Sequence, residues 1–139
     1  AQHHTRVRLS VAALASVTGG GWAPAAPPTL DAKLTSVTAP RVRPREVRLT
    51  LATPAGWHIA AEQPGASGLP TRVTWQLPAG WRVGAVRWPT PNREITGRDT
   101  LYTYEGRIII AARLDAAPGA LSGPIQATVS FGLCRDVCI

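Results

Sequence analysis

The sequence has no apolar run that approaches the roughly 18 residues of a membrane-spanning helix, and no signal peptide is recognisable at its start. These absences exclude a membrane span within the 139 residues. The first residues, Ala1-Gln2, are typical of a mature, processed end, and the last residue, Ile139, lies one position past a cysteine. We therefore expect an exported domain that has been excised from a longer protein.

Groups that carry hydrolytic or nucleotide chemistry are scarce: there are three histidines, eight carboxylates and no glycine-rich phosphate loop. Ser67 lacks the spacing of a nucleophile elbow. A Cys–His nucleophile needs His58 beside a cysteine, which nothing in the sequence requires, and a loop histidine is more often a solvated or capping residue. A metal site stays open at His3, because a free Ala1-Gln2-His3 terminus offers a square-planar nitrogen set for Cu(II) or Ni(II). The other interpretation of this segment is a disordered tail.

Lysine is almost absent, since fourteen of the fifteen basic residues are arginine, and the net charge is +7. Such a charge suits a nucleic-acid binder, but the arginines are spread singly along the chain. The densest patch, residues 41–48, alternates arginine with apolar residues, as the solvent face of a strand does. No recognition helix, aromatic RNA-binding strand or zinc spacing accompanies it. We therefore expect no nucleic-acid partner and a basic surface that favours acidic proteins.

Only two cysteines are present, Cys134 and Cys138, and they lie four positions apart near the end of the chain. In one strand, residues at this separation lie roughly 13 Å apart, whereas a disulfide needs Cα atoms about 4.4–6.8 Å apart. A bond between them therefore requires the chain to reverse over residues 135–137. A disulfide that closes a five-residue loop stabilises a fold by about 2 kcal/mol, against about 4–5 kcal/mol for one that closes a loop spanning a domain. This bond would therefore stabilise the fold only weakly.

Two interpretations of this pair stay open on spacing alone. A plain stabilising disulfide is the ordinary reason for two cysteines in a secreted domain. Closely spaced pairs also exchange, because the neighbouring thiol attacks and resolves a mixed disulfide. The C-x-x-x-C spacing is not the thioredoxin motif, and no helix-forming stretch follows to lower the pKa of a thiol.

The chain has the length of one domain, and its 13 glycines and 13 prolines favour short strands and turns over a helical bundle. Alternating apolar residues predict strands within 5–17, 30–37, 47–51, 73–77, 81–88, 101–114 and 125–134. We expect structured loops at 56–71 and 89–97, burial of residues 108–110 on both faces, and a last strand whose parity turns Cys134 away from the core. The pattern predicts an all-β fold, an immunoglobulin-like antiparallel β-sandwich, without the B–F disulfide of antibody domains.

Several short motifs follow one another in a specific order. They are Gly56-Trp57-His58, Pro64-Gly65, Gly68-Leu69-Pro70-Thr71, Trp75, Leu77-Pro78-Ala79-Gly80, Trp88-Pro89-Thr90-Pro91, Tyr104-Glu105-Gly106 and Cys134-Arg135-Asp136-Val137-Cys138-Ile139. In this order the chain resembles the N-terminal periplasmic domain of the transmembrane thiol:disulfide interchange reductases, the DsbD/ScsB family. The similarity runs from about residue 45 to the end. We therefore expect a single β-sandwich redox domain over 1–139, with its family-like core at 45–139 and N-terminal strands within 1–44.

The resemblance implies a protein-disulfide reductase whose redox pair is Cys134 and Cys138 and which has no cofactor of its own. Such domains take electrons from a membrane-embedded domain through a thioredoxin-like domain of the same protein. They then reduce thioredoxin-fold partner proteins in the periplasm. The parent protein is membrane-embedded, whereas this domain is soluble. The alternative is a non-catalytic immunoglobulin-like binding or assembly module with a purely structural disulfide.

The resemblance also implies site residues around the cysteines. The family's cap loop matches residues 92–97 and places Glu94 and Ile95 over the sulfurs. Here the sequence departs from the family pattern, because well-known members carry an aromatic cap where this chain has Ile95 and tyrosines near the positions of Trp57 and Ile59. The expected shield in this chain is Glu94, Ile95, Trp57 and Ile59. The attacking thiol is expected at Cys138.

Overall fold

The computed structural model describes residues 5–10, 14–17, 28–37, 45–65, 69–136 and 138. No described residue lies in an α-helix, so this part of the chain contains no helix that could cross a membrane. The described strands, in chain order, are β1 (Thr5–Ser10), β2 (Leu14–Val17), β3 (Leu30–Val37), β4 (Arg45–Ala52), β5 (His58–Gly65), β6 (Arg72–Gln76), β7 (Trp81–Arg87), β8 (Asn92–Thr96), β9 (Asp99–Glu105), β10 (Arg107–Ala116) and β11 (Gln126–Phe131).

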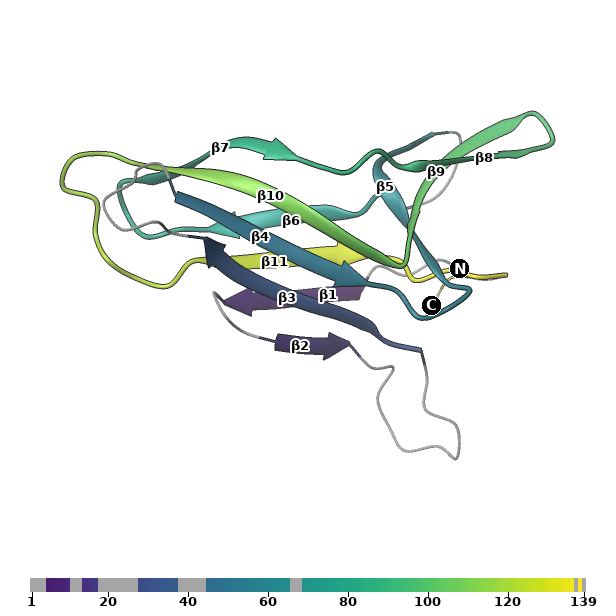
Figure 1. Ribbon diagram of the computed structural model, residues 1–139, viewed down its shortest axis with the longest axis horizontal. Helices are drawn as coiled ribbons and strands as arrows, with labels where there is room; N and C mark the ends of the chain where they lie inside the picture. Colours follow the sequence, from purple (N-terminus) through teal and green to yellow (C-terminus); the bar gives the residue numbers. More distant parts are fainter. Residues whose placement is uncertain are drawn as a thin grey trace.

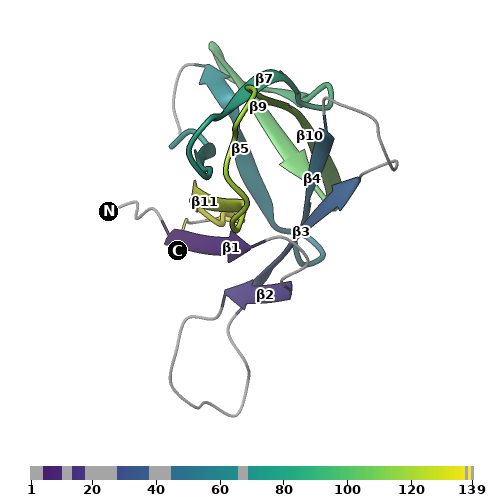
Figure 2. The ribbon, with the colours of Figure 1, turned by 90° about the vertical axis from the view of Figure 1, so that its left-hand side faces the viewer.

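The strands form three antiparallel sheets with the orders β1-β11-β6, β2-β3-β4-β10-β7 and β5-β9-β8. Figure 2 shows β1 and β11 in one layer and β3, β4 and β10 in the other. The third sheet ends in the β8–β9 hairpin, which projects from one end of the molecule (Figure 1). This architecture confirms the predicted all-β fold, an immunoglobulin-like antiparallel sandwich.

The core forms between the two layers because alternate side chains of each strand point inward. In β11, Ala127, Val129 and Phe131 are buried, and the residues between them are only half-buried. From the other layer, Leu49 on β4 pairs directly with Ile110 on β10, and both are fully buried. Burial of a large aliphatic side chain contributes about 1.5–3 kcal/mol. The alternation that predicted the last strand is therefore confirmed.

The prediction that Ile108, Ile109 and Ile110 are buried on both faces is wrong. Ile108 and Ile110 are buried, but Ile109 is 43% exposed. Strand β10 lies between β4 and β7 in an antiparallel sheet, and such a sheet packs one face on the core and leaves the other open to solvent. A run of three isoleucines does not reveal this arrangement, because β-branched residues also suit exposed strand positions.

Two segments that were predicted as loops contain strands. Strand β5 lies at the edge of its sheet, and its register shifts between Ala60 and Gly65, around Pro64, which has no N–H to give to a ladder. Strand β8 pairs with β9 through a two-residue turn at Gly97-Arg98, where Gly97 has a φ of 62°. Edge positions and a tight turn thus accommodate the glycines and prolines that favoured loops.

Candidate functional site

The segment that follows β11 places Cys134 beside the start of β5. Strand β11 ends at Phe131, and Gly132 and Leu133 remain buried as the chain continues past it. Cys134 then forms an isolated antiparallel bridge with His58, the first residue of β5. The His58 N–H donates to the Cys134 carbonyl at 2.8 Å, and the Cys134 N–H donates to the His58 carbonyl at 2.9 Å. Two reciprocal backbone bonds therefore hold the first cysteine against the third sheet.

Cys134 and Cys138 are joined by a disulfide, and their Cα atoms lie 4.0 Å apart. The two residues also pair as an isolated antiparallel bridge, so the chain reverses between them, as the spacing required. Both cysteines are half-buried, whereas Arg135 and Asp136 are exposed. The disulfide thus closes a five-residue ring at a surface turn, where another protein can approach it.

The charges beside the disulfide largely offset each other. Arg135 Nε lies 3.9 Å from Asp136 Oδ2, and both side chains are exposed. The Arg135 guanidinium also lies 5.0 Å from the centre of the Trp57 ring, which is a cation–π distance. Because this cation contacts both a carboxylate and an aromatic ring, local charge does not select one cysteine as the better thiolate.

A backbone carbonyl distinguishes the two sulfurs. Cys134 Sγ lies 3.7 Å from the carbonyl oxygen of Gly132. In the disulfide this sulfur carries no proton and donates nothing. The carbonyl is an acceptor within reach of a thiol proton at this position.

His58 is a functional candidate whose position the sequence did not predict. Its reciprocal bonds with Cys134 make the two residues direct cross-strand neighbours. Such neighbours project to the same face with Cβ atoms about 4.5–5.5 Å apart. The His58 and Cys134 side chains, both half-buried, therefore leave the bridge on the same face. No local pattern signals this pairing, because the residues are far apart in the chain and meet only through the tertiary fold.

Two of the expected shielding residues lie close to the start of β5. Trp57 immediately precedes this strand, is half-buried and contacts Arg135 inside the disulfide ring. Ile59, in β5 itself, is fully buried and pairs with Tyr104 on β9. The structure thus brings Trp57 to the disulfide ring and places the Ile59 side chain in the core.

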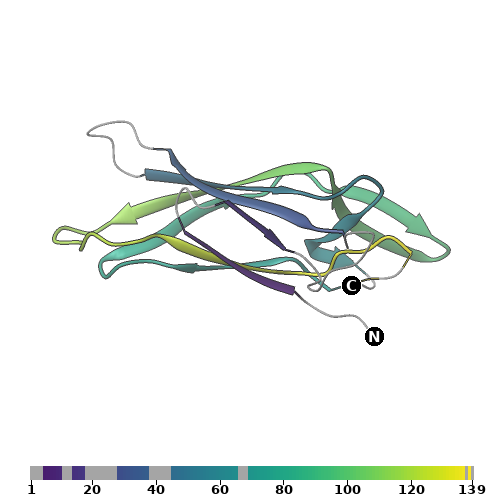
Figure 3. The same ribbon diagram turned by 90° about the horizontal axis from the view of Figure 1, so that it is seen from below.

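The other two, Glu94 and Ile95, lie on β8, in the hairpin at the end of the long axis toward which β11 runs (Figures 1 and 3). Ile95 is 63% exposed, and it pairs with Thr100, five residues along β9 from Glu105, the partner of His58. At about 3.3 Å per residue, this separation is roughly 17 Å along the sheet. Shielding of the sulfurs by Ile95 stays a prediction, and it requires the hairpin to bend toward the disulfide.

The possible copper or nickel ligand His3 and the serine considered above, Ser67, lie outside the described residues. Within the described part of the chain, no three His, Cys, Asp or Glu side chains gather as metal ligands do. The disulfide and its neighbours are therefore the chemical groups on which a functional interpretation of the described residues rests.

An immunoglobulin-like sandwich that carries an accessible disulfide in a tight C-terminal turn defines a domain equipped for thiol–disulfide chemistry. The family described as "Thiol:disulfide interchange protein DsbD, N-terminal" matches residues 27–139. The chain therefore belongs to this family, as its motifs predicted. The family match begins at residue 27, whereas the resemblance of the motifs was recognised only from about residue 45. No curated protein matches the chain.

A solved structure has the same fold. It is the crystal structure of the N-terminal periplasmic domain of ScsB from Proteus mirabilis, with a TM-score of 0.59 and 17% sequence identity. The match covers 79% of this chain and 42% of that one, so the chain spans less than half the length of the ScsB domain. At this identity the likeness shows the shared fold alone. The family match and the shared fold together identify an N-terminal domain of the DsbD family.

Proposed function

We propose that this chain is a periplasmic protein-disulfide reductase domain that works by thiol–disulfide exchange through Cys134 and Cys138. The observation that carries the proposal is the disulfide itself, a five-residue ring in a half-buried surface turn. A ring of this size stabilises the fold by only about 2 kcal/mol, so stability is a weak reason for its presence. Membership of the DsbD N-terminal family supports the same interpretation.

The exchange proceeds in two steps that conserve sulfur atoms and electrons. In the reduced domain, the Cys138 thiolate attacks one sulfur of the partner's disulfide, which forms a mixed disulfide and releases the partner's other sulfur as a thiolate. The Cys134 thiolate then attacks Cys138 Sγ, which forms the Cys134–Cys138 bond and releases the partner's second sulfur. The partner gains two electrons and, once both of its thiolates are protonated, two protons.

The family resemblance assigns the first attack to Cys138. Cys134 is the neighbouring thiol that resolves the mixed disulfide, and in the oxidised domain its Cα lies 4.0 Å from that of Cys138.

His58 supplies the proton acceptor for the second step. Cys134 must lose its proton before it attacks Cys138, and His58 is its direct cross-strand neighbour. Histidine is the side chain that most readily exchanges a proton near neutral pH. A positioned base of this kind accelerates proton transfer by about 10²–10⁴-fold.

The reductase needs a donor that restores its dithiol. A thioredoxin-like domain of the same membrane-embedded protein supplies the two electrons, by the same exchange chemistry in the opposite direction. The acceptors are thioredoxin-fold proteins of the periplasm. These partners bind at the surface turn that contains Cys134 and Cys138, where their own disulfides meet the cysteine pair.

Trapping of the mixed disulfide tests the function and the order of attack. Cys134→Ser lacks the resolving thiol, so it should accumulate a covalent complex with a thioredoxin-fold partner through Cys138. Cys138→Ser should trap little. Non-reducing gels and mass spectrometry measure both complexes. The reverse pattern would reverse the assignment and leave the redox function standing, whereas no trapping by either variant would favour a structural disulfide.

A redox titration separates the proposal from its rival, a non-catalytic module with a structural bond. An exchanging pair should have a reduction potential between about −270 and −180 mV, the range from thioredoxin to protein disulfide isomerase. A structural disulfide typically has a reduction potential below about −300 mV and therefore resists reduction. A measured value in the lower range would support the rival.

A further inference from the structure

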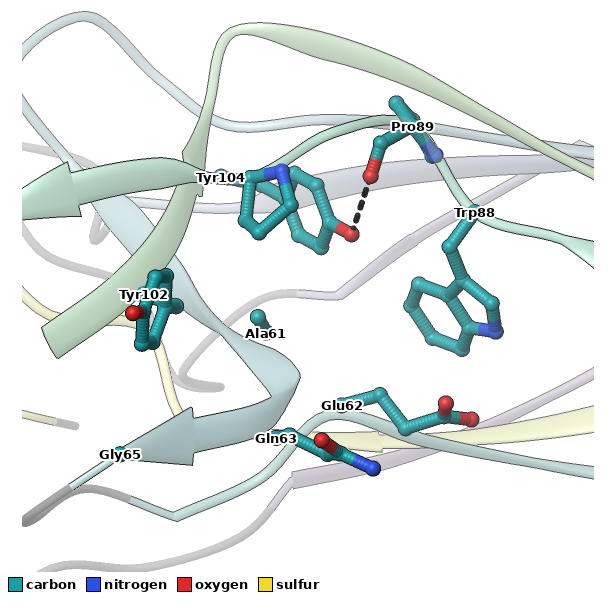
Figure 4. A pocket seen from close by; sticks show the side chains of 9 residues that line it. Ala61, Glu62, Gln63, Gly65, Trp88, Pro89, Tyr102 and Tyr104 are labelled. Atoms are coloured by element: carbon teal, nitrogen blue, oxygen red, sulfur yellow. Dashed lines mark hydrogen bonds between the residues drawn. The ribbon is translucent and has the colours of Figure 1, made fainter.

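A cavity of about 590 Å³ lies beside the third sheet, between β5, β9 and the segment that leads into β8. Figure 4 shows its aromatic walls, which come from Trp88, Tyr102 and Tyr104, and the acidic side chain of Glu62 at its edge. The volume falls within the range of about 300–1,000 Å³ that is usual for ligand pockets. Neither cysteine lines it, so it is a separate feature from the disulfide.

The aromatic wall is preformed and uncharged. The Trp88 and Tyr104 rings stack with centroids 6.1 Å apart and planes 19° apart. The buried Tyr104 donates its hydroxyl proton to the Pro89 carbonyl at 2.7 Å (Figure 4). Burial, and then the nearby Glu62 carboxylate, raise the pKa of Tyr104 above its ordinary value of 10.0, so the phenol is neutral at physiological pH. Little reorganisation is therefore needed to receive a flat side chain.

Glu62 is one of few acids in a chain that has an excess of basic residues. The chain has 15 lysines and arginines against eight acids. Elsewhere, Glu46 pairs with Arg48 and Arg87, and two aspartates pair with arginines close to them in sequence. Within the described residues, Glu62 has no such ion pair. An exposed carboxylate beside aromatic rings is thus left available for a cation from another molecule.

We propose that this cavity binds an arginine side chain of a partner protein. The guanidinium stacks on the Trp88 ring, and its N–H groups donate to the Glu62 carboxylate, which lies on the same side of the cavity (Figure 4). Arginine suits both features, because its planar cation stacks on aromatic rings and pairs with a carboxylate in a two-pronged geometry. An acidic side chain would be repelled by Glu62, and an apolar one would leave the carboxylate unpaired.

One partner can reach both the cavity and the disulfide. Ala61, on the cavity wall, lies three residues along β5 from His58, which is about 10 Å. A standard interface buries about 800 Å² on each side, a patch roughly 30 Å across. Tyr104, on the cavity wall, pairs with Ile59 and not with His58, so the cavity and the Cys134–His58 bridge face opposite sides of the third sheet, and one partner reaches both by wrapping around the edge strand β5. That the arginine belongs to an exchange partner rests on the proposed function, whereas the preference of the cavity for a guanidinium group does not.

A titration of the oxidised domain tests the site without any exchange chemistry. The probes are acetyl-Gly-Arg-Gly-amide and the same peptide with citrulline, which has the shape of arginine and no charge. Followed by NMR, the arginine peptide should shift the Trp88 indole N–H and bind roughly 5- to 10-fold more tightly than the citrulline peptide. Glu62→Gln should remove this preference. Glu105→Gln, which neutralises an exposed acid on β9 outside the cavity, should keep it.

Equal binding of the two peptides to the native domain would overturn the proposal, and so would an unchanged preference in Glu62→Gln. A kinetic measurement extends the test to the partner. The reduced domain should exchange faster with an arginine-containing peptide disulfide than with its citrulline counterpart, and Glu62→Gln should equalise the two rates. If neither peptide disulfide exchanges, the proposed function fails, and the binding titration still decides the question of the cavity.

Discussion

Reduction of the Cys134–Cys138 disulfide should leave the sandwich folded and lower its free energy of unfolding by no more than about 2 kcal/mol. In the chain-entropy model a cross-link changes the entropy of the unfolded chain by −2.1 − 1.5R ln n, where n is the number of residues in the closed loop. For a ring of five residues this is about −7 cal/mol/K, which stabilises the folded state by about 2 kcal/mol at 25 °C. A loop of 100 residues would contribute about 4.7 kcal/mol. The small ring is therefore what limits the effect.

The structure also explains why the terminal turn should survive reduction. The two backbone hydrogen bonds between His58 and Cys134 do not depend on the sulfur bond. Phe131 and Leu133, which precede the first cysteine, are buried in the core. These contacts hold the chain in place up to Cys134, so reduction releases only the last few residues.

Urea denaturation of the oxidised and the reduced domain measures the difference. The double variant Cys134→Ser/Cys138→Ser is the matched control, because it lacks the bond in the absence of any reductant. Linkage provides a second measurement: since about 30 mV corresponds to 1.4 kcal/mol for a two-electron couple, 2 kcal/mol is about 43 mV. The reduction potential of the cysteine pair in the folded domain should therefore lie no more than about 43 mV below its value in the unfolded chain.

Two outcomes would refute this reasoning. One is global unfolding when a reductant is added at room temperature. The other is a loss of about 4 kcal/mol or more, the size expected for a cross-link that spans a domain. Either result would mean that the disulfide holds structure beyond its own turn.

The remaining predictions concern single side chains. If the β8–β9 hairpin shields the sulfurs, Ile95→Ala should speed alkylation of the reduced cysteines by a bulky maleimide; unchanged rates would exclude this hairpin as the cap. His58→Asn should slow resolution of the mixed disulfide by roughly tenfold or more without changing the first attack, and added imidazole should restore the rate in stopped-flow measurements. The buried Thr71 hydroxyl has no hydrogen-bond partner among the described residues, so Thr71→Val should raise the free energy of unfolding by about 1 kcal/mol in urea; a loss of stability would contradict this. Because the pKa of Tyr104 is raised in the folded state, the unfolded phenol ionises first, and stability should fall as the pH rises above about 10; Tyr104→Phe should flatten this part of the pH profile.

The fold class could be predicted from local patterns. Strand β11 buries every second residue, so its alternation marked both the strand and its inward face. Glycines and prolines at regular intervals separated such strands and excluded long helices. The motif order and the closing cysteine pair then indicated the family, because residues that build turns and a small disulfide ring lie close together in the sequence.

The tertiary structure decided which marginal segments pair. Strands β5 and β8 contain, or lie beside, glycines and prolines, and they become strands because β9 offers both of its edges to them. Ile109 is exposed because of the layer that its sheet occupies, which its own neighbours in sequence do not encode. Pairing and layering depend on partners far along the chain, so local propensity does not determine them.

The candidate site divides in the same way. The sequence alone determined that Cys134 and Cys138 must reverse the chain if they bond, because backbone geometry limits what a four-residue separation allows. Only the tertiary structure placed His58 across from Cys134 and brought Glu62 to the aromatic wall that includes Trp88. These contacts join segments that are distant in the chain, and their register is set by the packing of whole sheets, which no local stretch of residues specifies.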